Sequence, residues 1–383
     1  MIVVKTLAGL EDLLAGELKQ LGANNIQILK RAVSCEGDKK LIYRINYECR
    51  TALKVLMSKF DFPAASEDEL YDNVKKIHWE DLLDVNTTFA IDGVVSNSNL
   101  NHSYFAALKT KDAIADYFQE KLGKRPSVDV KEPDLQLNVH INRNHCNISL
   151  DSSGDSLHKR GYRQSGGPAP INEVLAAGLI MMSGWKGKTS FLDPFCGSGT
   201  LLIEAAKQAM NIPPGYYRKS FAFFKWADFD EGLWKQVKEE ADARITETEI
   251  SIMGSDISDR ALLNARRNIQ AAQLHKDIVV MHSSFEKLMP PFEKGTIITN
   301  PPYGERIQKK DMIDFYKMMG DVFKQKYTGF DAYILAADFY AVKYLGLRSS
   351  FRIDVFNGKI PCKFIKFELY EGSKKAKKDT RPS

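Results

Sequence analysis

The sequence predicts an α/β protein in which two small α+β units precede a doubly wound α/β domain. The length of 383 residues exceeds that of a usual single domain. From residue 189 onward, short apolar runs alternate with helical segments, which is typical of an open parallel sheet with helices on both faces. Asn357 and Gly358 separate two strand-like runs near the C-terminus and predict an antiparallel hairpin at the end of that sheet.

The first α+β unit is expected over residues 1–65. A strand-like run over 1–7 precedes a helix over 9–22, in which leucines recur at helical spacing. Gly22 is a suitable stop for this helix, because glycine is common just past a helix end. A further strand is expected over 25–37.

The second unit is expected over residues 66–152. The expected elements are a helix over 67–83, a strand over 88–95, a helix over 104–123, and strands over 127–132, 135–144 and 145–151. Residues 153–170 are rich in Gly, Ser, Pro and basic groups, which is the composition of a linker.

The doubly wound domain is expected over residues 171–372. Its parallel strands are expected over 189–195, 250–258, 277–285, 295–303 and 331–339. Residues 373–383 form a basic tail that we expect to be disordered. The last ten residues carry five basic groups and one acidic group, so the net charge of +5 falls to +1 for the rest of the chain. Global charge is therefore weak evidence for a polyanionic partner.

The composition excludes several classes of protein. With 44% hydrophobic and 27% charged residues, the chain resembles an ordinary globular protein. Residues 1–18 lack a basic region and contain acidic residues, so neither a signal peptide nor a membrane span is expected, and we place the chain in the cytoplasm. The five cysteines form no C-x-x-C pair and the histidines show no ligand spacing, so no disulfide framework and no metal site are expected.

The first strand of the doubly wound domain leads into the turn LDPFCGSGTLLIEAA. In an open α/β sheet a ligand lies at this position, beyond the carboxyl ends of the strands. Gly197 and Gly199 allow the backbone to approach a ligand closely, and Asp193 ends the strand as a hydrogen-bond acceptor. A glycine pair also occurs in ordinary tight turns. Leu202 stands where a dinucleotide enzyme would have a third glycine, which disfavours a nicotinamide or flavin oxidoreductase.

Polar residues follow the next two strands as well. Asp256 comes after the second strand, where a carboxylate could receive two ribose hydroxyls. Ser284 and Phe285 come after the third, where a nucleoside base needs a partner for its edge and a flat apolar neighbour. Each residue alone also fits ordinary loop chemistry, but the three together indicate a nucleoside cofactor without a pyrophosphate.

The motif NPPYGER follows the fourth strand and therefore lies at the same edge of the sheet. Pro301 and Pro302 fix the backbone and cannot donate hydrogen bonds, so the Asn300 side chain and nearby carbonyls can be held as acceptors. Two acceptors facing an exocyclic amine would engage both of its hydrogens and direct the nitrogen lone pair at an electrophile. Tyr303 could stack on a base. The motif thus predicts transfer to an aromatic amine, in which the protein mainly supplies orientation.

DPFCGSGT together with NPPYGER resembles the class I S-adenosylmethionine-dependent methyltransferases that modify exocyclic amines. SLHKRGYR followed by APINEVLAA is similar to a narrower group, the THUMP-domain methyltransferases that methylate the guanine N2 amine of 23S ribosomal RNA. The resemblance covers essentially the whole chain. It implies a Rossmann-like methyltransferase domain preceded by ferredoxin-like and THUMP modules, with S-adenosylmethionine as cofactor and RNA, most simply 23S rRNA or a large-subunit assembly intermediate, as partner.

The resemblance also implies roles for individual residues. The glycine loop would hold the methionine moiety, Asp256 the ribose and Ile257 the adenine, while Ser284 stands where the family commonly has an acidic residue. The segment with Pro170 and Asn172 would cover the pocket. The expected cofactor residues are Pro170, Asn172, Asp193, Phe195, Cys196, Gly197, Gly199, Thr200, Asp256, Ile257, Ser284 and Phe285, and the expected catalytic residues are Asn300, Pro301, Pro302 and Tyr303.

Two clusters of basic residues are candidates for contacts with the RNA backbone. These residues are Lys159, Arg160 and Arg163 in the linker, and Arg306, Lys309 and Lys310 beyond the NPPY motif. Simple solvation is the competing interpretation for the linker group.

Other functions remain open at this level. A tRNA guanine-N2 methyltransferase and an N6-adenine methyltransferase of DNA or RNA would use the same chemistry. An RNA-binding protein with a decayed catalytic domain is the non-enzymatic alternative, although it would not need Gly197, Gly199, Asp256 and Asn300 together.

Overall fold

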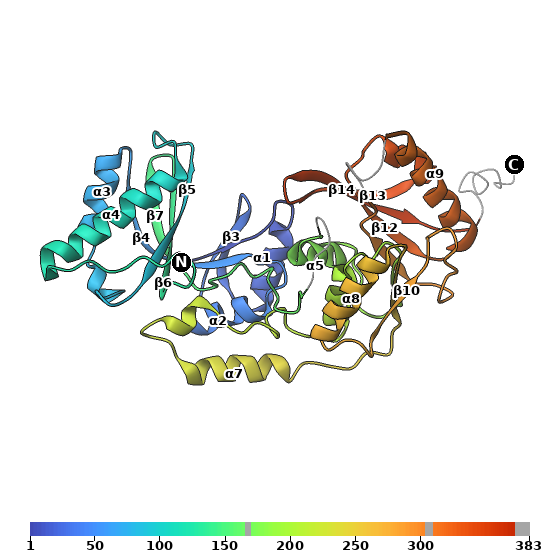
Figure 1. Cartoon of the computed structure of the whole chain (residues 1–383), viewed down its shortest axis with the longest axis horizontal. Coiled ribbons are helices and arrows are strands. Elements are labelled where there is room, and N and C mark those ends of the chain that lie inside the picture. The colour runs from blue at the N-terminus through green and yellow to red at the C-terminus, as the bar shows by residue number, and fades with distance from the viewer. Residues whose placement is uncertain (165–169, 303–308, 372–383) are drawn as a thin grey trace, which may run out of the picture. The chain divides into compact units, whose positions relative to one another are not determined.

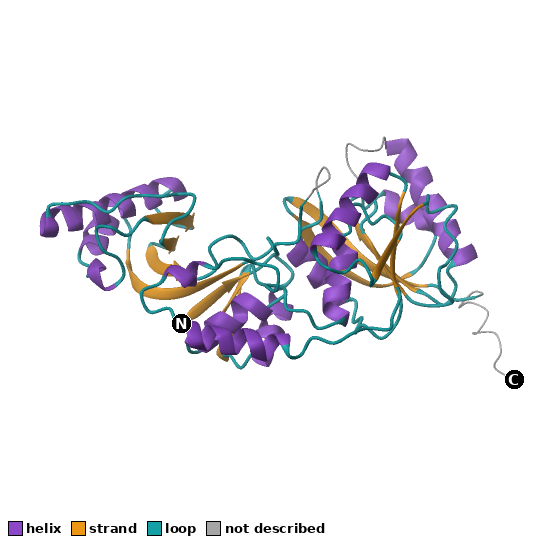
Figure 2. Ribbon diagram, turned by 60° about the horizontal axis from the view of Figure 1, so that its bottom comes forward, coloured by secondary structure: helices purple, strands orange, loops and turns teal. Residues whose placement is uncertain are grey.

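The structure is a computed structural model that describes residues 1–164, 170–302 and 309–371. In this part of the chain the strands form two seven-stranded sheets (Figures 1 and 2). Each sheet belongs to its own unit. One unit comprises residues 1–6, 14–157 and 218–240, and the other comprises residues 7–13, 158–217 and the chain from 241 onward.

The N-terminal unit contains one continuous sheet with the strand order β2-β3-β1-β4-β7-β6-β5. Its strands are β1 (Ile2–Lys5), β2 (Asn24–Leu29), β3 (Ala32–Glu36), β4 (Lys54–Pro63), β5 (Phe89–Ser96), β6 (Leu135–Asn142) and β7 (His145–Asp151). The long strand β4 pairs antiparallel with β1 on one side and with β7 on the other. The two α+β units expected from the sequence are therefore joined through one shared strand.

The helices α1 (Glu11–Gln20), α2 (Lys39–Glu48), α3 (Glu67–Lys75) and α4 (Ser103–Leu122) connect these strands. Two begin at a polar cap, because the Asp38 and Ser66 side chains accept hydrogen bonds from the backbone N–H groups of Leu41 and Glu69. Helices α3 and α4 lie next to each other, and α4 packs on β5 (Figure 1).

Three details of the N-terminal unit differ from the sequence-based prediction. The strand expected over 25–37 is a hairpin of β2 and β3, which turns at Arg31 with a left-handed φ of 58°. The strand expected over 127–132 is reduced to a single bridge between Phe89 and Val128. The helix expected over 67–83 ends at Lys75, and a short 3₁₀ turn follows over Trp79–Asp81.

The second unit contains the predicted doubly wound sheet, with the order β10-β9-β8-β11-β12-β14-β13. Its strands are β8 (Phe191–Asp193), β9 (Ile252–Asp256), β10 (Ile278–His282), β11 (Thr296–Thr299), β12 (Asp331–Ala336), β13 (Ser349–Asn357) and β14 (Ile360–Glu368). The five neighbouring strands β10, β9, β8, β11 and β12 are parallel, whereas β14 runs antiparallel to both β12 and β13. This confirms the predicted C-terminal hairpin.

Helices cover both faces of this sheet. The helices are α5 (Glu173–Met182), α6 (Thr200–Ala209), α8 (Asp259–Ala271) and α9 (Lys309–Lys326), with a 3₁₀ turn, η4 (Ala341–Leu345). One apolar core joins residues of α5, α6 and α8 with Phe191, and a second core joins residues of α9 with the next residue of the same strand, Leu192. Because successive strand residues point to opposite faces, the two cores lie on opposite sides of the sheet.

The aromatic-rich segment between α6 and β9 packs within the N-terminal unit. It forms a 3₁₀ turn, η2 (Ala222–Lys225), and a helix, α7 (Glu231–Asp242). The ring of Phe223 stacks on Tyr43 of α2 at a centroid distance of 4.4 Å, and Trp234 meets Tyr47 edge-on at 5.4 Å. A segment that lies within the doubly wound domain in sequence thus completes the core around α2.

Among the described residues, none of the helices combines the length and the apolar character that crossing a membrane requires.

Candidate active site

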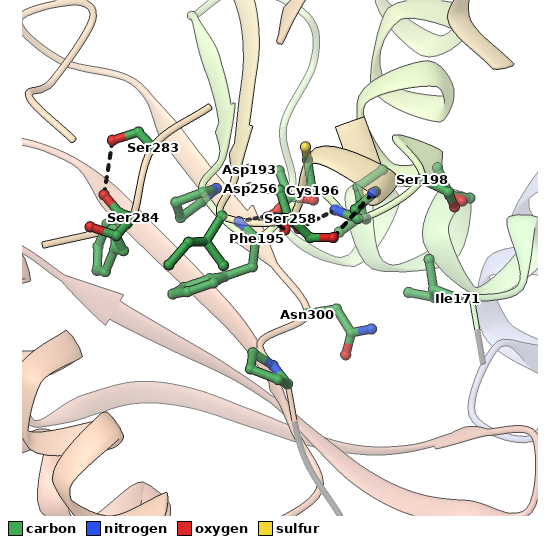
Figure 3. Close-up of a pocket in the computed structure, with 18 of the residues that line it drawn as sticks. Ile171, Asp193, Phe195, Cys196, Ser198, Asp256, Ser258, Ser283, Ser284 and Asn300 are labelled. Carbon is green, nitrogen blue, oxygen red and sulfur yellow. Dashed lines mark hydrogen bonds between the residues drawn. The ribbon is translucent and has the colours of Figure 1, made fainter. Parts of the chain in front are cut away.

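A cavity of about 650 Å³ lies at the carboxyl edge of the doubly wound sheet (Figure 3). Residues that follow β8, β9, β10 and β11 line it, as expected where parallel strands end together. The residues predicted from the sequence that line this cavity are Pro170, Asp193, Phe195, Cys196, Gly197, Thr200, Asp256, Ile257, Ser284, Phe285, Asn300 and Pro302. Four successive strand ends therefore contribute to one pocket.

The glycine loop brings backbone close to the cavity. Gly197 has a left-handed φ of 53°, and a Cβ atom added there would meet nothing within 4 Å, so the space beside it is open. Gly199, with φ 82°, is the N-cap of α6, and an added Cβ would lie 3.4 Å from the Cβ of Ala265 on α8. The first glycine thus leaves room for a ligand, and the second allows close packing of the loop on α8.

Asp193 ends β8 and is only 2% exposed. Its Oδ1 accepts hydrogen bonds from the Thr299 hydroxyl at 2.6 Å and from the Phe195 N–H at 3.2 Å, which ties the end of β8 to the end of β11. Burial raises the pKa of Asp193 to about 7, because these two hydrogen bonds only partly offset the loss of solvation, and nearby Asp256 raises it further. This carboxyl group therefore changes charge near neutral pH.

Asp256 at the end of β9 is held in position from two sides. Its Oδ2 accepts a hydrogen bond from the Gly197 N–H at 2.9 Å, and its Oδ1 accepts one from the Ser258 N–H at 2.9 Å (Figure 3). An ionised carboxylate has about four acceptor positions, so each oxygen can still accept another bond. Asp256 can thus orient the glycine loop and receive two hydroxyl groups at the same time.

The end of β10 supplies a polar atom without a partner. The Ser284 Oγ is buried and has no hydrogen-bond partner among the described residues. Phe285 is 2% exposed, and its ring packs against Phe195 and stacks on Tyr327 in the apolar core, so this ring mainly supports the wall of the pocket. Ile257 also lines the cavity and is 70% exposed, which leaves its side chain available to a flat ligand.

Asn300 follows β11 and lies apart from the Asp193 and Asp256 group in the pocket (Figure 3). Its Oδ1 is buried and has no hydrogen-bond partner among the described residues. Leaving a buried carbonyl oxygen unpaired costs about 1–3 kcal/mol, so this atom is suited to a donor that the protein itself does not provide. Pro301 is buried and Pro302 is half-buried and lines the pocket. The predicted residues Tyr303 and Arg306 lie outside the described part of the chain, as do the side chains of Lys309 and Lys310.

Two predicted arginines make contacts within the protein. Arg160 is 2% exposed, and its Nε lies 3.9 Å from Glu204 Oε1, so the structure corrects the expectation that it meets a phosphate at the surface. Arg163 donates hydrogen bonds to the carboxylate of Glu173 at 2.6 Å and to the Thr200 hydroxyl at 3.0 Å. It therefore ties the linker to the glycine loop. Lys159 is exposed.

Three predicted residues are placed beside the cavity without lining it. Asn172 caps α5, because its Oδ1 accepts hydrogen bonds from the Val174 and Leu175 N–H groups at 2.9 and 3.3 Å. Gly199 and Pro301 lie one residue away from lining residues in the chain.

The sequence-based prediction missed about half of the lining. The missed residues are Ile171, Pro194, Ser198, Leu201, Ser258, Ala261, Asn264, Ser283, Glu286, Phe315 and Met318. Ser258, Ala261 and Asn264 recur every three residues at the start of α8, which is a signal that sequence alone could have given. Phe315 and Met318 belong to α9, and only the packing of that helix brings them to the pocket.

No cluster of His, Cys, Asp or Glu that could hold a metal ion occurs in the described ranges.

A parallel sheet that ends in an antiparallel hairpin, with a glycine loop, an acidic residue and an N-P-P motif at successive strand ends, defines a class I methyltransferase. Residues 160–366 match the family model of the RMKL-like methyltransferase domain. Residues 64–151 match the THUMP domain, and residues 1–56 match the RlmL ferredoxin-like domain. The chain belongs to the RMKL-like methyltransferases, and S-adenosylmethionine, predicted from the sequence, is the cofactor of this family.

Curated and solved relatives extend over nearly the whole chain. The Synechocystis sp. protein named "Putative RNA methyltransferase slr0064" is 41% identical over 364 residues, which cover 94% of this chain and 95% of that protein. The crystal structure of SMU.472, described as "a putative methyltransferase complexed with SAH", superposes with a TM-score of 0.87 at 29% identity and covers 97% of this chain and 98% of the other. A "possible methylase" of Clostridium difficile 630 gives a TM-score of 0.87 at 30% identity, with 97% and 99% covered.

Proposed function

We propose that this methyltransferase transfers the methyl group of S-adenosylmethionine to the exocyclic N2 amine of a guanine in 23S ribosomal RNA. The single observation that carries the proposal is the buried, unpartnered Oδ1 of Asn300 in the pocket at the carboxyl edge of the sheet. Among the described residues nothing donates a hydrogen bond to this oxygen, so no contact there offsets the cost of burying it.

Asn300 Oδ1 would accept a hydrogen bond from the target amine. A second acceptor from the neighbouring backbone would engage the other hydrogen, which favours a pyramidal nitrogen with its lone pair directed at the methyl donor. The sulfonium group supplies an already activated methyl, so the protein needs to position the amine rather than to deprotonate it strongly. The rigid prolines at 301 and 302 keep the position of Asn300 fixed.

The residues of the pocket suit a nucleoside cofactor. The open space at Gly197 would take the methionine part, and Asp256 would receive the ribose hydroxyls while it holds the loop. The unpaired Ser284 Oγ is the candidate partner for the edge of the adenine, in place of the usual acidic residue. Ile257 would cover the adenine face.

RNA as the substrate is supported by two features. The N-terminal unit matches the THUMP domain, which the resemblance associates with RNA binding, and the 41% identical relative carries the name of an RNA methyltransferase. The choice of guanine N2 rests on SLHKRGYR and APINEVLAA, which resemble the guanine-specific group. Exposed Lys159 within the first of these segments is the remaining linker candidate for a phosphate contact.

Mass spectrometry of ribosomal RNA nucleosides, mapped by fragment, tests the proposal in cells with and without the gene. We expect the loss of one N2-methylguanosine from 23S rRNA in the deletion strain and its return on complementation with the wild-type gene but not with Asn300→Ala. An unchanged rRNA profile with a loss of methylguanosine from tRNA would overturn the rRNA assignment. A loss of N6-methyladenosine instead would overturn the choice of base. The target atom would then be the one named for the 28% identical Listeria monocytogenes protein described as a "predicted N6-adenine-specific DNA methylase", although that name gives DNA as the substrate.

A further inference from the structure

Exposed and half-buried aromatic and lysine side chains gather at the carboxyl end of β12, the strand next to β11. Tyr340 is 60% exposed and Phe339 is 39% exposed, although large aromatic side chains are usually buried. Each aromatic ring in this cluster has a lysine Nζ within 6 Å of its centroid. The pairs are Lys343 with Tyr340 at 5.9 Å, Lys317 with Tyr344 at 5.7 Å and Lys363 with Phe339 at 5.1 Å. We call these six residues the aromatic–lysine platform.

The platform lies at the same edge of the sheet as the active site. Strands β11 and β12 are parallel and in register, with Thr299 opposite Ile334. The loop after β12, which carries Phe339 and Tyr340, therefore leaves the sheet at the same edge as the Asn300 loop after β11. Adjacent strands are about 5 Å apart, so the loops that carry Asn300 and Tyr340 start from neighbouring positions at this edge.

Helix α9 connects the platform with the pocket directly. Phe315 and Met318 of α9 line the cavity, and Lys317 lies between them in the chain and reaches the Tyr344 ring. The 3₁₀ turn η4 comes so close to α9 that a Cβ on Gly320 would lie 1.9 Å from the carbonyl oxygen of Leu345. The surface that carries Lys343 and Tyr344 is thereby fixed to the helix that forms one wall of the pocket.

The platform is organised before any ligand arrives. Asp338 Oδ1 accepts hydrogen bonds from the N–H groups of Tyr340 and Ala341, both at 2.9 Å, which fixes the turn that presents Tyr340. The hydroxyl groups of Tyr340 and Tyr344 lie 2.9 Å apart. Rings held in this way lose little conformational freedom when a base stacks on them.

The charges of the platform fit a phosphate backbone. Lys317 pairs with Asp314 at 3.5 Å and Lys363 pairs with Asp354 at 3.1 Å, and these aspartate side chains are 62% and 77% exposed. Exposed pairs of this kind contribute only about 0–1 kcal/mol, so a phosphate can compete for the lysines. Asp338 faces the same turn, but its Oδ1 is already used by two backbone N–H groups.

We propose that the aromatic–lysine platform binds the single-stranded RNA segment next to the target nucleotide, with a base stacked on Tyr340 and phosphates near Lys343. The proposal rests on the proposed function, since it takes RNA as the substrate of the same pocket. Exposed aromatic rings interleaved with lysines are the arrangement by which proteins bind single-stranded nucleic acid without strong sequence preference. When a target base enters the pocket, the neighbouring nucleotides must stay outside it, and the platform would bind these nucleotides.

Fluorescence anisotropy with a labelled oligouridylate of about 15 nucleotides tests the platform in the full-length protein with S-adenosylhomocysteine present. Tyr340→Leu is expected to weaken binding about tenfold, while Tyr340→Phe, which keeps the ring, stays within about twofold of wild type. Lys343→Gln is expected to lower the slope of log affinity against log salt by about one. The matched control is Tyr370→Leu, because Tyr370 is 44% exposed and follows β14 at the opposite edge of the sheet.

Cross-linking of the same oligonucleotide with 4-thiouridine, followed by peptide mass spectrometry, locates the contact. We expect the peptide that contains residues 338–348 to be labelled in wild type and not in Tyr340→Leu. Wild-type affinity and labelling in Tyr340→Leu, or labelling confined to other peptides, would overturn the platform. The same variants are also assayed for methylation of rRNA from the deletion strain, so the two proposals can fail separately. If Tyr340→Leu weakens oligonucleotide binding but the wild type methylates no guanine, only the assigned target is overturned. If the wild type methylates guanine but Tyr340→Leu binds the oligonucleotide normally, only the platform is overturned.

Discussion

Two asparagines with buried Oδ1 atoms, Asn46 in one unit and Asn300 in the other, differ in how these atoms are satisfied. Asn46 on α2 is 2% exposed, and its Nδ2 donates to Ile42 O and Ser152 Oγ while its Oδ1 accepts from Ser153 Oγ. Asn300 in the methyltransferase unit has a buried Oδ1 without a partner in the described structure. Folding alone favours the first arrangement, because each buried polar atom is satisfied. The second arrangement is stable only at a net cost, which indicates an atom reserved for a ligand.

The aspartates of the two units repeat this contrast. Asp151 is 2% exposed, forms an ion pair with Lys54 and accepts a hydrogen bond from the Ser153 N–H. Asp193 is equally buried, but its partners are the hydroxyl and backbone groups of Thr299 and Phe195 rather than a cation. Burial raises the pKa of both carboxyl groups. The N-terminal unit thus pairs its buried carboxylate Asp151 with a lysine, whereas Asp193 in the methyltransferase unit lines the pocket and has no cationic partner among the described residues.

Among the substitutions that test this contrast, Asn300→Ala should have the largest effect. Removing the proposed acceptor of the target amine should lower kcat about a hundredfold to a thousandfold, the range seen when one positioned hydrogen-bonding group is lost from an active site. Affinity for S-adenosylhomocysteine in calorimetry and the melting temperature should stay close to wild type, because Oδ1 has no hydrogen-bond partner among the described residues. A variant that methylates RNA at the wild-type rate would contradict the role of Asn300.

Asp256→Ala should act on cofactor binding rather than on the chemical step. Loss of the proposed charge-assisted hydrogen bonds to the ribose and of the bond to the Gly197 N–H should weaken S-adenosylhomocysteine binding by about 2 kcal/mol, or about thirtyfold. Asp256→Asn, which keeps one acceptor oxygen, should lose less. The control is Asp259→Ala, since the Asp259 side chain is 91% exposed at the start of α8. Equal calorimetric affinities for the Asp256 and Asp259 variants would remove the ribose contact from the proposal.

Asn46→Ala should show the opposite behaviour to Asn300→Ala. Its removal takes away the acceptor of the Ser153 hydroxyl and the donor to Ser152, so we expect a loss of about 1–2 kcal/mol in the free energy of unfolding. Chemical denaturation measures this loss, and the kcat for methyl transfer below the transition should remain near wild type. If Asn46→Ala impaired catalysis as strongly as Asn300→Ala, the distinction between paired and unpaired asparagines would fail.

The sequence predicted the methyltransferase unit better than the N-terminal one. Strand and helix alternate there, and the residues that follow parallel strands necessarily share one edge, so Asp193, Asp256, Ser284 and Asn300 could be brought together without coordinates. Phe315 and Met318 could not be found in this way, because only the packing of α9 turns them toward the cavity.

Other features depend on contacts between distant parts of the chain. The segment that contains Phe223 and Trp234 lies within the methyltransferase domain in sequence, yet its rings pack on α2. Arg160 and Arg163 occur in a stretch with the composition of an exposed linker, and only the buried partners Glu204 and Glu173 show that they hold the structure together. Composition indicates that a segment can be exposed to solvent, but it does not show which acidic residues of other elements pack against its arginines.

The smallest effect that we predict concerns the buried carboxyl group of Asp193. Its pKa is about 7 in the folded protein and near 4 in an unfolded chain, so the folded state binds the proton more tightly. The resulting stabilisation is fully present below pH 4 and is lost as the pH rises through 7. Between pH 6 and pH 8 the wild type should lose about 1 kcal/mol relative to Asp193→Asn, which keeps the acceptor for Thr299 and cannot ionise. Denaturation at both pH values measures the difference, with Asp354→Asn as the exposed control. A constant difference between wild type and Asp193→Asn would mean that the folded protein does not titrate Asp193 between pH 6 and pH 8, which would contradict a pKa raised to about 7.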